Sequence, residues 1–81
     1  MKFYIIKPKS QQISPPLVVG ILSVYPDAES ATSIDEADTV ILQGNWTLSK
    51  YCMDEYKYAK SRNKKILEDH GFLWKYRVHL N

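Results

Sequence analysis

Several sequence features that indicate particular functions are missing from this sequence. The chain of 81 residues has one cysteine, so it forms no internal disulfide, which fits a reducing, cytoplasmic location. It has three glycines and neither a phosphate-binding loop nor a Gly-x-Gly-x-x-Gly turn, so ATPase and dinucleotide-fold functions have no support. Its two histidines have no second ligand at metal spacing, so we expect no metal site.

Long hydrophobic runs and a strong charge are also missing. The longest apolar stretch, residues 17–24, is interrupted by Gly20 and Ser23 and is shorter than the roughly 20 residues that span a membrane. The first eight residues lack the apolar run and cleavage site of a signal peptide. The net charge of +2 comes without a dense basic stripe. We therefore expect neither a membrane nor a nucleic acid as partner.

What is present predicts a single α/β domain over residues 1–81. The hydrophobic content of 44% and charged content of 25% are ordinary for a globular protein. Runs of strand-forming residues at 3–6 and 39–42 predict strands, and residues 29–33 and 64–68 predict two further short ones. The run at 39–42 is apolar without alternation, which suits a central parallel strand covered on both faces.

Two segments have helical spacing. One begins at Ser14-Pro-Pro16 and ends before Pro26, and Gly20 within it predicts a close approach to the sheet. The longer one opens at Thr47 or Ser49 and runs to about Asn63. Its predicted buried face consists of Leu48, Cys52, Tyr56 and Ala59. Because this face packs inward, Cys52 is interpreted as a packed thiol rather than a nucleophile.

The last residues are ambiguous. Residues 69–71 predict a turn, and residues 72–80 fit either a last strand or a covering helix. The apolar side chains in this segment either complete the core or form an exposed patch for a homodimer. The whole order predicts a minimal flavodoxin-like, three-layer domain with a short, mostly parallel sheet of four to five strands.

Polar and aromatic residues gather at the carboxyl ends of the predicted strands, where such sheets bind ligands. Pro8 and Lys9 follow the first strand, Asn45 and Trp46 follow the central one, and the start of the long helix lies beside them. On this helix Glu55 comes three residues after Cys52, at the border of the apolar stripe. A partly desolvated carboxylate there suits acid–base or nucleophilic work, or it forms a structural pair with Lys9, with Arg62 or with a backbone amide.

The segment around this helix resembles a known superfamily. Ser49-Lys-Tyr-Cys-Met-Asp-Glu55 is similar to the hydroxyl, Trp-Cys and glutamate pattern of TIR-like domains. The Ala37-Asp38 pair before the central strand, and a first strand that ends near Pro8, are similar to nucleoside 2-deoxyribosyltransferase-like proteins. The resemblance covers residues 34–67 well and residues 1–8 loosely.

The resemblance implies an activity and a site. In enzymatic members the matching glutamate cleaves the N-glycosidic bond of NAD or of a nucleoside, so Glu55 is the implied catalytic residue. From their place beside it and their chemistry, we expect the substrate-binding residues to be Pro8, Lys9, Asn45, Trp46, Ser49 and Tyr51. NAD enters as a substrate, and no cofactor is implied. The chain departs from the pattern at Tyr51, where TIR-like domains have tryptophan, and at Lys7, where the transferases have glycine.

Two hypotheses therefore stay open from the sequence. In the first, the protein binds or cleaves a nucleotide or nucleoside at Glu55. In the second, it is a non-catalytic protein-interaction module of the same fold, and associates with a second copy through residues 72–80.

Overall fold

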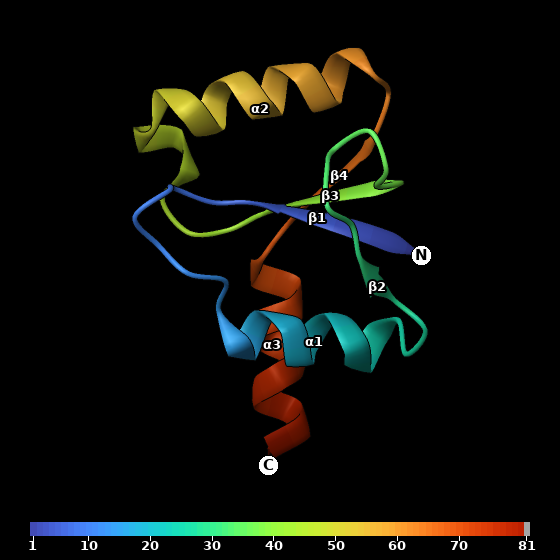
Figure 1. Cartoon of the computed structure of the whole chain (residues 1–81). Coiled ribbons are helices and arrows are strands. Elements are labelled where there is room, and N and C mark those ends of the chain that lie inside the picture. Colours follow the sequence, from blue (N-terminus) through green and yellow to red (C-terminus); the bar gives the residue numbers. More distant parts are fainter. Residues whose placement is uncertain (81) are drawn as a thin grey trace.

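Four parallel strands form one sheet in the order β2-β1-β3-β4 (Figure 1). The computed structural model describes residues 1–80, with side chains placed through Val78. The strands are β1 (Lys2–Ile6), β2 (Glu29–Ser30), β3 (Thr39–Leu42) and β4 (Lys65–Glu68). The helices are α1 (Pro15–Val24), α2 (Lys50–Ser61) and α3 (His70–Leu80), with a 3-10 turn η1 (Trp46–Leu48) before α2.

The layers confirm the predicted flavodoxin-like topology. Helix α2 covers one face of the sheet, while α1 and α3 lie on the other (Figure 1). All four residues of β3 are buried, as expected for a central strand that packs on both sides. In β1 the side chains alternate, so that Phe3 and Ile5 join the core on the α1 and α3 side, and Ile6 joins the core under α2.

The start of α2 follows from its sequence. Ser49 is the N-cap, and its hydroxyl accepts a hydrogen bond from the Cys52 amide at 3.4 Å. Cys52 and Ala59 are buried and Tyr56 is half-buried, as predicted. The prediction for Leu48 was wrong: it lies in η1, outside the helical period, and its exposed fraction is 83%.

Gly20 marks a close approach, but to α3 rather than to the sheet. A Cβ built on Gly20 would lie 2.0 Å from the carbonyl oxygen of Phe72. The two helices therefore cross with their backbones almost touching, which only a glycine allows. Phe72 is buried in the same contact, and its ring lies 6.4 Å from that of Tyr25.

The segment that follows β4 is helical over His70–Leu80. The predicted turn at residues 69–71 was wrong, because α3 begins at His70 directly after β4. Residues 72–80 belong to this helix, which resolves the ambiguity between strand and helix. The predicted strand at residues 29–33 is shorter than expected, since β2 ends at Ser30. Among the described residues, no helix has the length and apolar content that crossing a membrane requires.

Candidate functional site

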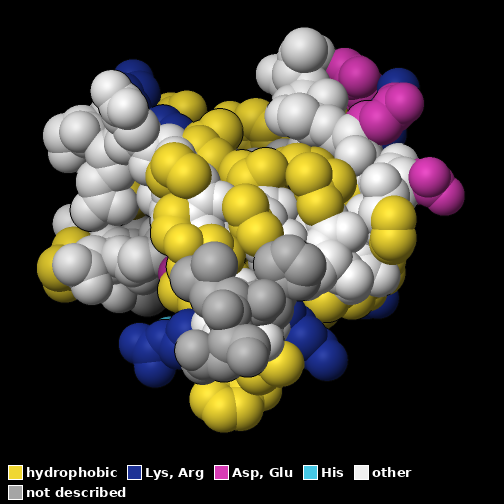
Figure 2. Space-filling view, turned by 90° about the horizontal axis from the view of Figure 1, so that it is seen from below, with side chains coloured by type: hydrophobic (Ala, Val, Ile, Leu, Met, Phe, Trp, Pro, Cys, Tyr) yellow, Lys and Arg dark blue, Asp and Glu magenta, His cyan; other side chains and the backbone are white. Residues whose placement is uncertain are grey.

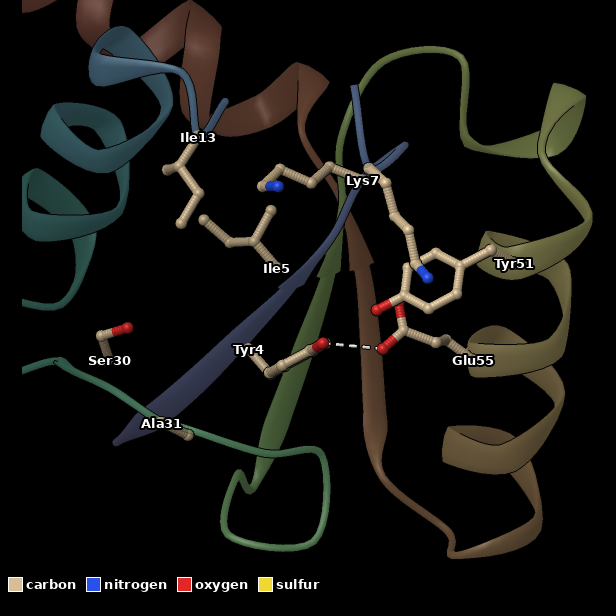
Figure 3. Close-up of a pocket in the computed structure, with 9 residues that line it drawn as sticks. Tyr4, Ile5, Lys7, Ile13, Ser30, Ala31, Tyr51 and Glu55 are labelled. Carbon is tan, nitrogen blue, oxygen red and sulfur yellow. Dashed lines mark hydrogen bonds between the residues drawn. The ribbon is translucent and has the colours of Figure 1, made fainter. Parts of the chain in front are cut away.

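A pocket of about 250 Å³ opens beside β1, at the point where β2 ends. The β1–α1 loop and the first two turns of α2 close its sides (Figure 3). It is lined by Tyr4, Ile5, Lys7, Lys9, Ile13, Ser30, Ala31, Tyr51 and Glu55. The pocket therefore combines a carboxylate, two phenols and two ammonium groups with an apolar wall.

A hydrogen bond between β1 and α2 forms the centre of the pocket. The hydroxyl of Tyr4 donates to Oε2 of Glu55 at 2.7 Å, and Figure 3 shows the two side chains pointing toward one another. Tyr4 points to the α2 side because neighbours along a strand face opposite ways. The structural partners expected for Glu55 are engaged elsewhere, since Arg62 pairs with Asp35 at 3.6 Å and Lys9 lies over Tyr51.

The environment of Tyr4 fixes its protonation. Burial of the phenol raises the pKa of Tyr4 above its ordinary value, and the hydrogen bond and negative charge of Glu55 raise it further. The phenol therefore stays protonated near neutral pH. It acts as a donor that orients the carboxylate of Glu55 and does not act as a base.

Two lysines bring positive charge to the same pocket. The ammonium of Lys9 lies 4.5 Å from the centroid of the Tyr51 ring, a cation–π contact between the β1–α1 loop and α2. Lys7, at the end of β1, lines the same pocket. Two ammonium groups beside an open cavity favour an anionic group on whatever the pocket binds.

The buried amide of Gln43 holds the loop that carries these residues. Its Oε1 accepts from the Ser14 amide at 3.0 Å, and its Nε2 donates to the Gln12 carbonyl at 3.0 Å. Gln43 follows β3 directly, so these bonds tie the β1–α1 loop to the central strand. They fix one wall of the pocket.

The structure brings three of the predicted site residues together: Lys9, Tyr51 and Glu55. The other four lie at different places. Pro8 closes a turn through its carbonyl, which accepts from Gln11, and Ser49 caps α2. Trp46 packs on Tyr56 at 4.8 Å between ring centroids, and Asn45 is exposed at the start of η1. The ligand roles of these four residues stay predictions.

Sequence reasoning missed part of the pocket. Tyr4 was assigned only to a buried strand, and Ile13, Ser30 and Ala31 only to a loop and a strand. The alternation of β1 would have placed Tyr4 on the face opposite Phe3 and Ile5, the face that α2 covers. No local signal marks Ser30 and Ala31, because their position depends on β2 being two residues long.

The predicted gathering of loops at the carboxyl edge is present, and part of it, Lys9 and the start of α2, lines the pocket. The Gly44 amide donates to Oδ2 of Asp69 at 3.0 Å, so the ends of β3 and β4 are joined. Gly44 has a φ of +59°, a conformation that suits glycine at this turn. This contact is structural, because both partners are satisfied by each other.

Comparisons of the chain with protein-family models, with curated proteins and with solved structures find no match. What stands is a small α/β domain with a four-stranded, all-parallel sheet.

Proposed function

We propose that the protein binds a nucleoside or nucleoside monophosphate in the pocket beside β1 and cleaves its N-glycosidic bond with Glu55. The observation that carries the proposal is the hydrogen bond between Tyr4 and Glu55 in a pocket that also contains Lys7, Lys9 and Tyr51. The resemblance of residues 34–67 to TIR-like and deoxyribosyltransferase-like proteins supports the same assignment for Glu55.

The chemistry follows from the groups present. As the bond between the sugar C1′ and the base nitrogen breaks, positive charge develops on the sugar, and a carboxylate beside C1′ stabilises it. The bonding electrons leave with the base, and a water oxygen forms the new bond to C1′, with the water's proton passing to the base. Tyr4 holds Oε2 of Glu55 in place and leaves Oε1 for the substrate.

The size and charge of the pocket narrow the substrate. At about 250 Å³ it is smaller than the 300–1,000 Å³ typical of drug-sized ligands, so a nucleoside fits better than NAD. Lys7 and Lys9 provide the positive charge that a 5′-phosphate requires. Tyr51 provides an aromatic face for stacking.

The test is base release from deoxynucleosides, deoxynucleoside monophosphates and NAD, measured by chromatography. We expect release from a nucleoside or its monophosphate by the wild-type chain and at least a 100-fold lower rate in Glu55→Gln, which keeps the size and the acceptor for Tyr4. A matched control is Asp54→Asn, an exposed carboxylate on α2. No release from any substrate by folded wild-type protein would overturn the proposal.

A second candidate function, self-association, is favoured by the surface of α1 and α3. Figure 2 shows hydrophobic side chains gathered on this face, with Lys and Arg side chains beside them. Helix α1 contains no charged residue, and Leu22 is 40% exposed. On α3, Trp74 is 62% exposed and Val78 is 53% exposed. An uncharged helix with exposed apolar side chains is typical of one that packs against a partner.

The second candidate has its own test. Lys75 and Arg77 on α3 repel a second α3, so the second copy would pack on α1. Sedimentation analysis is expected to show a dimer that Leu22→Lys dissociates and that Lys60→Glu, on the opposite layer, leaves intact. A wild-type chain that stays monomeric at high concentration would contradict self-association.

A further inference from the structure

The edge of β1 is only partly covered by β2. The register pairs Lys2 with Glu29 and Phe3 with Ser30, and β2 ends there. The last bond to this side is donated by the Ala31 amide to the Phe3 carbonyl at 2.8 Å. Beyond Ala31 the chain leaves β1, so the edge of β1 is open from Tyr4 onward.

The main-chain groups of Ile5 point to this open edge. In a parallel ladder alternate residues bond to opposite neighbours. The carbonyls of Lys2 and Ile6 accept from the β3 side, from Asp38 and Gln43, whereas Phe3 bonds to the β2 side. Ile5 therefore faces the same way as Phe3, away from β3. Within residues 1–80, its N–H and C=O have no hydrogen-bond partner.

Ile5 is also one of the residues that line the pocket beside β1, although its exposed fraction is only 7%. Native proteins pair nearly all of their buried main-chain donors and acceptors, and a pair that lines a cavity is open to a ligand. An unpaired donor and acceptor in the wall of a cavity therefore indicates the chemistry of the ligand.

We infer that the open edge of β1 at Ile5 binds the edge of a nucleobase, as a short mimic of the missing strand. This inference rests on the proposed function and names how the pocket recognises its substrate. The N–H and C=O of one extended residue lie side by side and present a donor next to an acceptor. Nucleobases present the complementary pair, such as the amino group and ring nitrogen of adenine or cytosine.

The surroundings of Ile5 favour a small planar ligand over a peptide strand. The pocket is closed on one side by Ile13 and on the other by Tyr51 and Glu55, which lie on opposite sides of β1 in Figure 3. In a cavity of about 250 Å³ the free main-chain groups are the N–H and C=O of one residue, Ile5, whereas the addition of a peptide strand uses a longer run of main-chain hydrogen bonds.

The placement of the base also orients the reacting bond. Ile5 and Tyr4 are neighbours, and the hydroxyl of Tyr4 is bonded to Glu55 on the α2 side. A base held at Ile5 therefore directs its sugar toward Glu55. The ammonium groups of Lys7 and Lys9 are within the same cavity for a 5′-phosphate. Base recognition and bond cleavage thus use adjacent residues of one strand.

The ligand side of the test compares two nucleosides. One is 2′-deoxyadenosine, and the other is the deoxyribonucleoside of benzimidazole, which has a similar shape but no adjacent donor and acceptor. Equilibrium binding to the wild-type chain is expected to be about 10-fold tighter for deoxyadenosine, the effect of about one net hydrogen bond.

The protein side of the test removes the N–H of Ile5, with a control that shares the weaker acceptor that an ester carbonyl makes. The chain is short enough for chemical synthesis, and Cys52 provides a ligation site between fragments 1–51 and 52–81. Replacing Ile5 by its hydroxy acid turns the Tyr4–Ile5 amide into an ester and leaves the side chain in the core. A matched control is the same exchange at Ile66 of the edge strand β4. The N–H of Lys65 donates to the Asp38 carbonyl, on the β3 side, so the N–H of the next residue, Ile66, points away from β3.

The ester at residue 5 is expected to lower the preference for deoxyadenosine over the benzimidazole nucleoside several-fold, while the ester at residue 66 leaves it unchanged. Binding of both nucleosides to the wild-type chain with no preference, or a preference that is unchanged by the ester at residue 5, would overturn the inference and leave the proposed function standing. Failure of both nucleosides to bind the wild-type chain would overturn the two together.

Discussion

The hydroxyl of Tyr4 donates to Glu55 at 2.7 Å, although the two residues are 51 positions apart in the chain. One residue comes from the first strand and the other from the helix that follows the central strand. The bond joins sheet and helix at the wall of the pocket, so it is both a tertiary contact and a constraint on the carboxylate.

Tyr4→Phe removes the donor and keeps the ring. We expect base release to fall about 10-fold, because Glu55 is no longer held in one orientation, and we expect stability to fall by about 1 kcal/mol. Steady-state kinetics and thermal unfolding measure the two effects. Tyr58→Phe is the control, since Tyr58 makes a similar bond to Asp35 at 2.6 Å but is exposed and outside the pocket. Equal rates for Tyr4→Phe and wild type would contradict the role of Tyr4.

The same phenol predicts a dependence on alkaline pH. The pKa of Tyr4 is raised in the folded protein, chiefly by burial and then by Glu55, so the unfolded chain loses this proton first. The stabilisation is therefore complete below the ordinary tyrosine pKa of about 10 and is lost as pH rises above it. Tyr58 contributes in the same direction, because its bond to Asp35 raises its pKa.

Denaturant unfolding at pH values from 8 to about 11 checks this dependence. Burial is the largest cause of the raised pKa at Tyr4, whereas at Tyr58 it comes after the hydrogen bond to Asp35. Tyr4→Phe therefore removes more of the pH-dependent stabilisation, and it is expected to lose less stability over the alkaline part of the range than Tyr58→Phe. Parallel curves for Tyr4→Phe and wild type would show that the phenol of Tyr4 is not desolvated.

Much of the fold was predictable from local patterns, and the pocket was not. The apolar run of β3 and the serine cap of α2 gave correct elements because each depends on a few neighbouring residues. The prediction for Leu48 was wrong because the helical spacing of α2 was extended to a residue that comes before the N-cap, Ser49. The α3 helix has no clear apolar face in the sequence, so its form depends on packing against α1 around Gly20.

The site residues that were predicted correctly are Lys9, in the loop after β1, and two residues of one helix. Tyr51 and Glu55 lie one turn apart on α2, so spacing alone brings them together. Tyr4 joins them through the order of strands, and the open edge at Ile5 exists because β2 stops after two residues. Both are consequences of tertiary structure that no local pattern encodes.

Gly20→Ala is expected to destabilise the protein even though alanine favours helices. The new Cβ would meet the Phe72 carbonyl at 2.0 Å, and a backbone oxygen moves only if α3 moves. We expect a loss of about 1–3 kcal/mol in the free energy of unfolding, measured by denaturant titration. Gly71→Ala is the control, because nothing lies within 4 Å of its Cβ, and it should leave stability unchanged or raise it by up to about 1 kcal/mol. A neutral Gly20→Ala would contradict the close crossing of α1 and α3.

Gln43→Leu tests whether the amide of Gln43 fixes the pocket wall. It removes the side-chain acceptor of the Ser14 amide and the side-chain donor to the Gln12 carbonyl, so both main-chain groups of the β1–α1 loop lose these hydrogen bonds. We expect a loss of about 2 kcal/mol in stability, measured by thermal unfolding, together with weaker nucleoside binding. Gln12→Leu, whose main-chain bond is retained, should behave as wild type. A stable Gln43→Leu chain with normal binding would show that the loop holds its shape without these bonds.

Lys9→Met tests the phosphate end of the pocket. It keeps most of the side-chain length over Tyr51 and removes the charge. We expect binding of deoxyadenosine monophosphate to weaken about 10-fold, while binding of deoxyadenosine changes little. Calorimetric titrations of both ligands give the ratio, with Lys57→Met on the exposed part of α2 as control. Equal losses for the two ligands would argue for a packing role of Lys9 in place of phosphate binding.

The most direct test of the account is a titration of the ¹⁵N-labelled protein with deoxyadenosine monophosphate, followed by NMR. We expect saturable shifts that cluster at the pocket, at Tyr4, Ile5, Lys9, Tyr51 and Glu55, with the amide of Ile5 among the largest. An absence of shifts at high ligand concentration, or shifts confined to the α1 and α3 face, would contradict it.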